Sequence, residues 1–313
     1  MIKVDYSQFY SINLISLEHH FDNMTKWYDS GFFPKVLLLN GKKGIGKFTL
    51  VMHFLNYIFS KNEKKKYDLK NKLINVESIF YNSILNQTTQ DVIFFKAEEG
   101  KNLKIEDIRN LKSILSKTSL SNEPRFIIID EVEFLNQNSA NALLKTLEEP
   151  NNNNYFILIN NQQAELMETI SSRCLKNNIY VNFHQRKKII DHLFKNKEIS
   201  ITFDDNNNLT PGILLNYNDL IVKYKIIDNE NIASKINKLL NGYKKDRNKA
   251  LINMSFFLID HFFYLLINAK KNRIEFLLNT KSTIINKIND FVLYNLNIKS
   301  VINFIDLKLK YVS

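Results

Sequence analysis

The chain has 313 residues, of which 44% are hydrophobic and 24% charged, and this composition is typical of soluble globular domains. Its length suffices for two or three domains. The formal net charge of +11 permits an acidic partner such as DNA, but the abundance of lysine, asparagine and isoleucine explains the charge equally well as a compositional bias. The single cysteine, Cys174, excludes an internal disulfide and a zinc site of several cysteines, and favours a reducing, cytoplasmic compartment.

No segment of the sequence predicts contact with a membrane. Met1–Tyr10 lacks the apolar core of a secretory signal, so we expect none. Leu251–Ala269 is apolar enough to suggest a spanning helix, but it contains Asp260 and His261, and such groups are costly near the centre of a bilayer. We therefore predict a buried helix there and no membrane partner.

The first third of the chain predicts a phosphate-binding loop. A helix over Leu17–Tyr28 precedes Val36–Leu39, a short apolar run that predicts a buried strand. Gly41–Lys47 then matches the pattern G-x-x-x-x-G-K, and a helix is predicted from there to Ser60. Glycines let the backbone N–H groups turn inward, and the start of the helix adds partial positive charge, so this order of elements suits an anion.

One position departs from this motif. The residue after Lys47 should carry the hydroxyl that binds Mg²⁺, but it is Phe48, and Thr49 comes one place late. Successive helical residues are about 100° apart around the axis, so Thr49 cannot simply replace it. We therefore predict a P-loop fold in which ATP hydrolysis is weak or absent.

Alternating strands and helices follow. Residues 61–90 predict a helix-containing surface excursion, in which Lys64–Lys66 forms either a solvated face or a nucleic-acid contact. Beyond it the predicted elements are, in order, a strand at Asp91–Ala97, a helix at Ile105–Leu115, a strand at Phe126–Ile129, a helix at Asn138–Glu149 and a strand at Tyr155–Ile159.

Polar residues follow two of these strands. Asp130 and Glu131 come directly after one buried run, and Asn160 and Asn161 after the next. Ligands of open α/β sheets bind at the carboxyl ends of the strands. In a P-loop enzyme the first carboxylate positions Mg²⁺ and the second polarises the attacking water. Surface carboxylates that cap a strand are the alternative.

Beyond Asn178 the pattern is helical, with one turn signal at Leu209–Gly212. Helices without intervening strands form a bundle, and we expect it to serve as an interaction surface. The predicted helices are His184–Lys195, Ile213–Tyr224, Ala233–Gly242, Ala250–Ala269, Arg273–Asn289 and Asp290–Leu309.

Two segments carry a specific resemblance. DEVEFLNQNSANALLKTLEEP at Asp130–Pro150 and YFILINNQQAELMETISSRC at Tyr155–Cys174 resemble the AAA+ subunits of bacterial replicative clamp loaders, the γ/τ and δ′ subunits of DNA polymerase III. By motif the resemblance covers Leu14–Cys174. It implies that Arg173, in the Ser-Arg-Cys triplet, is an arginine finger that acts in trans on the ATP of a neighbouring subunit. It also places Asn160 at the first sensor position, where the family usually carries Thr.

Departures from the family pattern distinguish between its subunits. Thr210-Pro211-Gly212 resembles the lid segment in which hydrolysing members carry a second sensor arginine, but Ile213, Leu214 and Leu215 follow here. The zinc-binding cysteine cluster of many relatives is absent from the sequence. Together with Phe48, these features favour the δ′ (delta-prime) type. The acidic pair Asp130-Glu131, typical of an active member, argues for the alternative, an ATP-hydrolysing γ/τ-type subunit.

The sequence thus predicts an α/β P-loop AAA+ domain, a parallel sheet flanked by helices, over residues 1–180, a small helical lid over 181–225 and a helical collar over 226–313. The expected partners are the γ/τ and δ subunits in a hetero-pentamer, with the sliding clamp and primed DNA. A different AAA+ protein of DNA repair or recombination is a third, weaker interpretation. We expect at most weak ATP or ADP binding and no zinc. The predicted degenerate nucleotide site consists of Gly41, Gly44, Ile45, Gly46, Lys47, Phe48, Thr49, Asp130, Glu131 and Asn160.

Overall fold

The computed structural model describes residues 11–96, 111, 115, 124–150, 153–195, 209–227, 229–269 and 273–312. The chain divides into two compact units. The first comprises Met1–Lys195 with Leu209–Ile213, and the second comprises Asn196–Asn208 with Leu214–Ser313. The first unit holds all the predicted nucleotide-site residues and Arg173. The predicted boundaries at residues 180 and 225 stay predictions.

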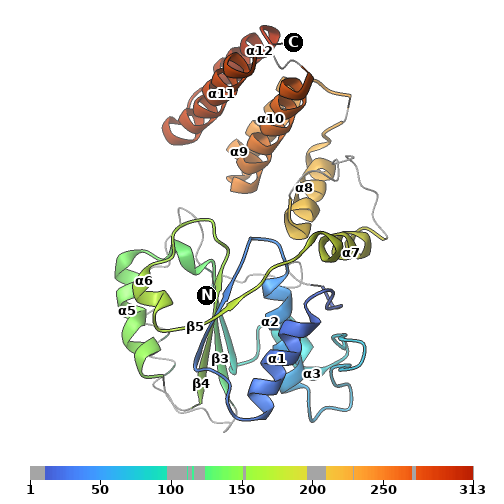
Figure 1. Ribbon diagram of the computed structural model, residues 1–313, viewed down its shortest axis with the longest axis vertical. Helices are drawn as coiled ribbons and strands as arrows, with labels where there is room; N and C mark the ends of the chain where they lie inside the picture. The colour runs from blue at the N-terminus through green and yellow to red at the C-terminus, as the bar shows by residue number, and fades with distance from the viewer. Residues whose placement is uncertain are drawn as a thin grey trace. The chain divides into compact units, whose positions relative to one another are not determined.

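The first unit alternates strands with helices (Figure 1). Its described elements are α1 (Glu18–Asp29), β1 (Val36–Asn40), α2 (Lys47–Phe59), α3 (Ile79–Leu85), β2 (Val92–Lys96), β3 (Arg125–Asp130), the 3₁₀ turn η2 (Val132–Phe134), α5 (Gln137–Glu148), β4 (Asn154–Asn160), α6 (Glu168–Ser171), β5 (Leu175–Asn178) and α7 (Phe183–Leu193). The four predicted strands are confirmed. The helix predicted over Ile105–Leu115 lies outside the described residues, except for Leu111 and Leu115, which are buried.

The strands form one parallel sheet in the order β2-β3-β4-β1-β5. Asn40 at the end of β1 is in register with Asn160 of β4 and with Asn178 of β5. Because parallel strands all end at the same edge, residues that follow β1, β3 and β4 are brought together there.

Helices cover both faces of the sheet (Figure 1). Alternate strand residues point to opposite faces, so Leu37 and Leu39 of β1 belong to the core cluster with α1, α2 and α3. Val36 and Leu38 belong to the other cluster, with α5 and Ile170 of α6. This two-sided burial explains why β1, β3 and β4 read as continuous apolar runs.

One expectation for this unit is wrong, and one strand was not predicted. Residues 61–90 are more than a surface excursion, because Tyr67, Ile74, Phe80 and Ile84 are buried in the core cluster with α2. The strand β5 was not predicted, because its sequence Leu-Lys-Asn-Asn has no apolar run. As an edge strand it pairs only with β1, and its residues are largely exposed.

The second unit is helical in its described part, as predicted. α8 (Pro211–Tyr224) begins in the first unit and continues into the second, which also contains α9 (Ile232–Asp246), α10 (Lys249–Ala269), α11 (Ile274–Tyr294) and α12 (Ile298–Lys310). The break predicted at Asn289-Asp290 is wrong. α11 continues to Tyr294, Asn295 takes the left-handed conformation that ends a helix, and the Asn297 side chain caps α12.

By length and composition α10 is apolar enough to cross a membrane, with a mean hydropathy of 1.7. In the structure it packs against α9 and α11, and Leu251, Met254 and Phe263 are fully buried. The core helix of a helical bundle has the same composition. Tyr264 and Leu265 are about half exposed, however, and 39% of the apolar window is buried, so the helix is buried in part and not throughout.

Candidate functional site

The loop between β1 and α2 has the backbone of an anion-binding loop. Gly44 and Gly46 have φ angles of 80° and 98°, in the left-handed region that glycine enters without a steric penalty. Gly46 is the N-cap residue of α2 and has no side chain to cap it, so the N–H groups of the first turn are available to a ligand. Ile45 is buried in the core and anchors the loop.

Lys47, the predicted phosphate-binding lysine, is directed back onto its own loop. Its Nζ atom donates hydrogen bonds to the carbonyl oxygens of Gly41 at 2.6 Å and Lys42 at 2.7 Å. Only 3% of the residue is exposed, and burial lowers the pKa of its ammonium group to about 8, although Asp130 and Glu133 act to raise it. The cation at the start of α2 is therefore only partly compensated, and an anion placed near it would be stabilised.

Phe48 is partly buried and packs against the core. Its ring packs on Phe94 of β2, with 5.9 Å between centroids, and contacts the core cluster beside α2. An aromatic side chain carries no oxygen ligand for Mg²⁺. Across the described part of the chain, no group of three or more His, Cys, Asp and Glu is placed to hold a metal ion. Thr49, the next residue, is half-buried on α2.

The predicted acidic pair lies at the carboxyl end of β3, and a lysine of the P-loop forms an ion pair with its second residue. Glu131 is 4% exposed and has a left-handed φ of 58°. Its Oε1 atom accepts a hydrogen bond from Lys43 Nζ at 2.7 Å, and Lys96 Nζ lies 3.9 Å away. Asp130 accepts from the N–H of Glu131 at 2.9 Å and from Asn161 Nδ2 at 3.1 Å. Sequence reasoning missed Lys43, because it was an undistinguished residue inside the loop pattern.

Asn160 belongs to a ladder of asparagines along this edge of the sheet. Its Nδ2 atom donates to Asn40 Oδ1 at 3.0 Å, and Asn40 Nδ2 donates to Asn178 Oδ1 at 2.8 Å. Gln162 donates to Asn160 through its backbone N–H at 2.9 Å. The predicted sensor position is therefore tied into the sheet edge by its neighbours. The register of the strands makes this ladder, and no sequence pattern indicated Asn40 or Asn178.

Glu133 shapes the loop after β4. Its carboxylate accepts hydrogen bonds from the N–H of Asn161 at 3.0 and 3.1 Å and lies 3.5 Å from the N–H of Gln163. The side chain is buried, and this burial raises the pKa of the carboxyl group, opposed by those N–H donors. Sequence reasoning missed this residue as well.

The start of α8, with Thr210 just before it, packs directly on the P-loop. The N–H of Gly212 donates to the Gly44 carbonyl at 2.8 Å, and Thr210 Oγ1 donates to the Lys43 carbonyl at 2.6 Å. A Cβ atom on Gly212 would lie 2.9 Å from the Cα atom of Gly44. The two backbones thus touch, and Ile213, the next residue, carries no charge toward the loop.

Arg173 lies at the other end of the sheet, where its strands begin. It follows α6 and precedes β5, whose Leu175 pairs with Leu37 near the start of β1, whereas the P-loop follows the end of β1. The ends of a five-residue strand are about 13 Å apart. Arg173 therefore does not reach the P-loop of its own chain.

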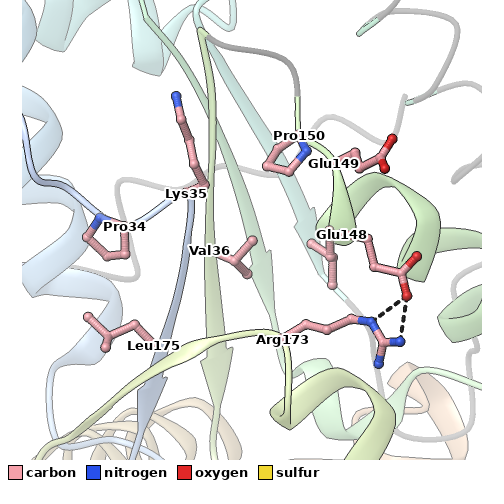
Figure 2. A pocket seen from close by; sticks show the side chains of 9 residues that line it. Pro34, Lys35, Val36, Glu148, Glu149, Pro150, Arg173 and Leu175 are labelled. Atoms are coloured by element: carbon pink, nitrogen blue, oxygen red, sulfur yellow. Dashed lines mark hydrogen bonds and ion pairs between the residues drawn. The ribbon is translucent and has the colours of Figure 1, made fainter.

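The Arg173 side chain is 33% exposed and borders an open cleft of about 530 Å³ (Figure 2). Its Nε and Nη2 atoms bind Oε1 of Glu148 at 2.7 and 2.5 Å, and Nη1 donates to the Thr169 carbonyl at 2.8 Å. The cleft is lined by Pro34, Lys35, Val36, Leu147, Glu148, Glu149, Pro150, Arg173 and Leu175.

The predicted site therefore keeps the groups that would bind a phosphate but lacks a ligand for the metal ion at position 48. The glycines, the uncapped start of α2 and Lys47 suit a phosphate group, so a nucleotide would be held by these residues. Position 48 offers no metal ligand, and Lys43 occupies the carboxylate of Glu131.

Comparison with known proteins finds subunits of DNA polymerase III among the relatives of this chain. A family model described as "DNA polymerase III, delta subunit" matches residues 17–182, more than half of the chain. A DNA polymerase III subunit delta' from Pseudomonas aeruginosa is 33% identical over 90 residues, which are 28% of this chain and 27% of that protein. A DNA polymerase III subunit gamma from Buchnera aphidicola of Acyrthosiphon pisum is 28% identical over 166 residues, 53% of this chain and 44% of that protein. The matches thus span less than half of either relative. A solved structure, a gamma subunit-related protein from Thermotoga maritima, has a TM-score of 0.46 at 18% identity over 95% of this chain and 99% of that one.

Proposed function

The chain belongs to the DNA polymerase III delta subunit family, the AAA+ subunits of bacterial clamp loaders, and from this premise we propose that it acts as the delta-prime-type subunit. In this role its own P-loop domain does not hydrolyse ATP. It presents Arg173 to the ATP bound by a neighbouring γ/τ-type subunit, and the assembly loads the sliding clamp onto primed DNA in the cytoplasm.

The position of Arg173 is the observation that carries the proposal. Its guanidinium lies at the end of the sheet where the strands begin, away from the P-loop of its own chain. A third of the side chain is exposed beside an open cleft. A guanidinium supplied from outside an ATP site stabilises the negative charge that develops on the transferred phosphoryl group. The position of Arg173 supports this role at the ATP site of a second subunit and not at that of its own chain.

The chain's own loop supports the absence of turnover. Phe48 packs on Phe94 where a hydroxyl would bind Mg²⁺, and Lys43 neutralises the carboxylate of Glu131. A paired Glu131 is not free to polarise water. Ile213, next to the P-loop segment, supplies no second arginine.

A reconstituted complex tests this role. Arg173→Ala should leave assembly intact and slow hydrolysis at the neighbouring site by about 10³-fold. The total DNA-stimulated ATPase rate of the complex should then fall by the fraction that this one site contributes. Lys176→Ala, which removes an exposed cation three residues away, is the matched control and should keep the full rate. An undiminished rate in the Arg173→Ala complex would reject the trans role.

The alternative is a short γ/τ-type ATPase, favoured by Lys47 and by the acidic pair at the end of β3. Binding of a fluorescent ATP analogue to the purified chain discriminates between the two. We expect Mg²⁺ to leave the affinity unchanged, because residue 48 offers no ligand, and Phe48→Thr to introduce a dependence on Mg²⁺. If Mg²⁺ already strengthens binding to the unaltered chain, and that chain turns over ATP, the γ/τ-type role is correct.

A further inference from the structure

Glu148 makes the main contact of the proposed arginine finger. Both Nε and Nη2 of Arg173 bind its Oε1 atom, as the dashed lines of Figure 2 show. Glu149, which lines the same cleft, points its carboxylate away from Arg173 (Figure 2). Of these two adjacent carboxylates, Glu148 contacts the guanidinium and Glu149, the C-cap residue of α5, points away from it.

The location of Glu148 disfavours a role in helix stability. It is the last residue of α5, at the end where the helix macrodipole is negative. A carboxylate there is repelled by the free carbonyl groups, and helices favour basic residues at this position. The Arg173 cation offsets that repulsion. The placement of an acid at this end of the helix is thus explained by the arginine that it contacts.

The backbone on both sides of Arg173 is also anchored. The Arg173 N–H donates to the Ile170 carbonyl at 3.1 Å, and β5 begins two residues later. With the main chain held by α6 and β5, the direction of the side chain depends on its own contacts. Among the described residues, Glu148 and the Thr169 carbonyl are its partners within 3 Å.

These contacts leave part of the guanidinium available. The group has five N–H donors. One on Nε and one on Nη2 bind Glu148, and those of Nη1 are directed to Thr169 and, at 3.4 Å, to Ser172. No described residue binds the second N–H of Nη2, so this group can donate to an incoming anion. The guanidinium is therefore held along one side while its end stays able to bind a phosphate oxygen.

We propose that Glu148 is a positioning residue for Arg173, fixing the guanidinium so that it enters the neighbouring ATP site in a productive orientation. This inference rests on the proposed function. Both side chains are partly exposed, at 33% for Arg173 and 46% for Glu148, and an exposed pair is too weak to sequester the arginine from a triphosphate. The pair limits the conformations of a long side chain, which is how orientation lowers a barrier.

The test compares five variants in the reconstituted complex, measuring DNA-stimulated kcat and KM for ATP. We expect Glu148→Ala to lower kcat about fivefold at the affected site with little change in KM. Glu148→Gln keeps an oxygen acceptor in the same place and should recover most of the rate. Glu149→Ala, the matched control, should keep it fully. In an Arg173→Ala background, Glu148→Ala should have no further effect.

The melting temperature separates positioning from a structural role. Glu148→Ala removes a stabilising ion pair and also removes the repulsion at the end of α5, and these two effects on stability have opposite signs. The variant should therefore shift the melting temperature by less than about 2 °C. If Arg173→Ala slows the complex and Glu148→Ala does not, or if Glu148→Ala lowers the rate equally without the arginine, this inference is wrong. If Arg173→Ala itself keeps the full rate, the proposed function has failed.

Discussion

Lys47 combines deep burial with an ionisable group. Its ammonium is bound by two loop carbonyls, and Asp130 and Glu133 attract it, yet burial dominates and lowers its pKa from 10.5 to about 8. The folded state thus releases this proton more easily than the unfolded state. Such a lysine is destabilising while charged, and its loop gains if an anion approaches.

The depressed pKa of Lys47 predicts a pH dependence of stability. Below about pH 8 the lysine is charged in both states, and the full penalty is present. Between about pH 8 and 10.5 the unfolded state binds more protons, so the free energy of unfolding rises with pH, by up to about 3 kcal/mol from this group. Denaturant titrations should show that the free energy of unfolding of the wild type, relative to that of Lys47→Met, is higher at pH 10 than at pH 7. A constant difference between the two proteins would show that the pKa is not depressed.

At the scale of elements, the start of α8 is adapted to the P-loop. Gly212 lies in the first turn of this helix, where alanine would ordinarily be preferred by about 1 kcal/mol. Its N–H binds the Gly44 carbonyl, and a Cβ atom there would lie 2.9 Å from both Cα and O of Gly44. Since both partners are backbone atoms, neither can move aside without distorting the loop.

Gly212→Ala should therefore destabilise the protein although it increases helix propensity. We expect a loss of about 1–3 kcal/mol, typical of overpacking, from denaturant unfolding. Asn216→Ala, at an exposed position of the same helix, is the control and should be neutral or slightly stabilising. Equal stability of the two variants would mean that the contact with Gly44 is not maintained in solution.

On the scale of the whole molecule, the helical unit leaves large apolar side chains in contact with solvent. Leu293 and Tyr294 at the end of α11 are 73% and 71% exposed, and Tyr311 after α12 is 74% exposed. In a clamp-loader subunit these positions suit the predicted collar, which holds neighbouring subunits. Buried apolar surface is the main favourable term in protein association.

Leu293→Asp should weaken incorporation of the chain into the assembly without unfolding it. Burying one leucine contributes about 1.5–3 kcal/mol, so we expect association to weaken by about tenfold or more. Co-purification with the other subunits, followed by mass analysis of the intact assembly, measures this. Phe32→Asp is the control, because that ring is 81% exposed in the first unit. Unchanged incorporation of Leu293→Asp would exclude this end of α11 from the collar.

The sequence alone determined the features that depend on local pattern. Apolar runs identified the strands β1, β2, β3 and β4, and in β1, β3 and β4 these runs are continuous because strands covered on both faces exclude polar residues. Glycine spacing identified the P-loop, and the identity of residue 48 showed that its metal ligand was missing. The Ser-Arg-Cys triplet, through resemblance, singled out Arg173. Each of these signals lies within a few consecutive residues.

The tertiary structure decided every relation between distant segments. β5 became a strand by pairing with β1, although its residues are polar. The contacts of Lys43 with Glu131, of Gly212 with Gly44 and of Arg173 with Glu148 join residues 25 to 168 positions apart. The sheet register and the packing of helices on it create these contacts. No local pattern encodes such distances, since they depend on how the whole domain closes around its core.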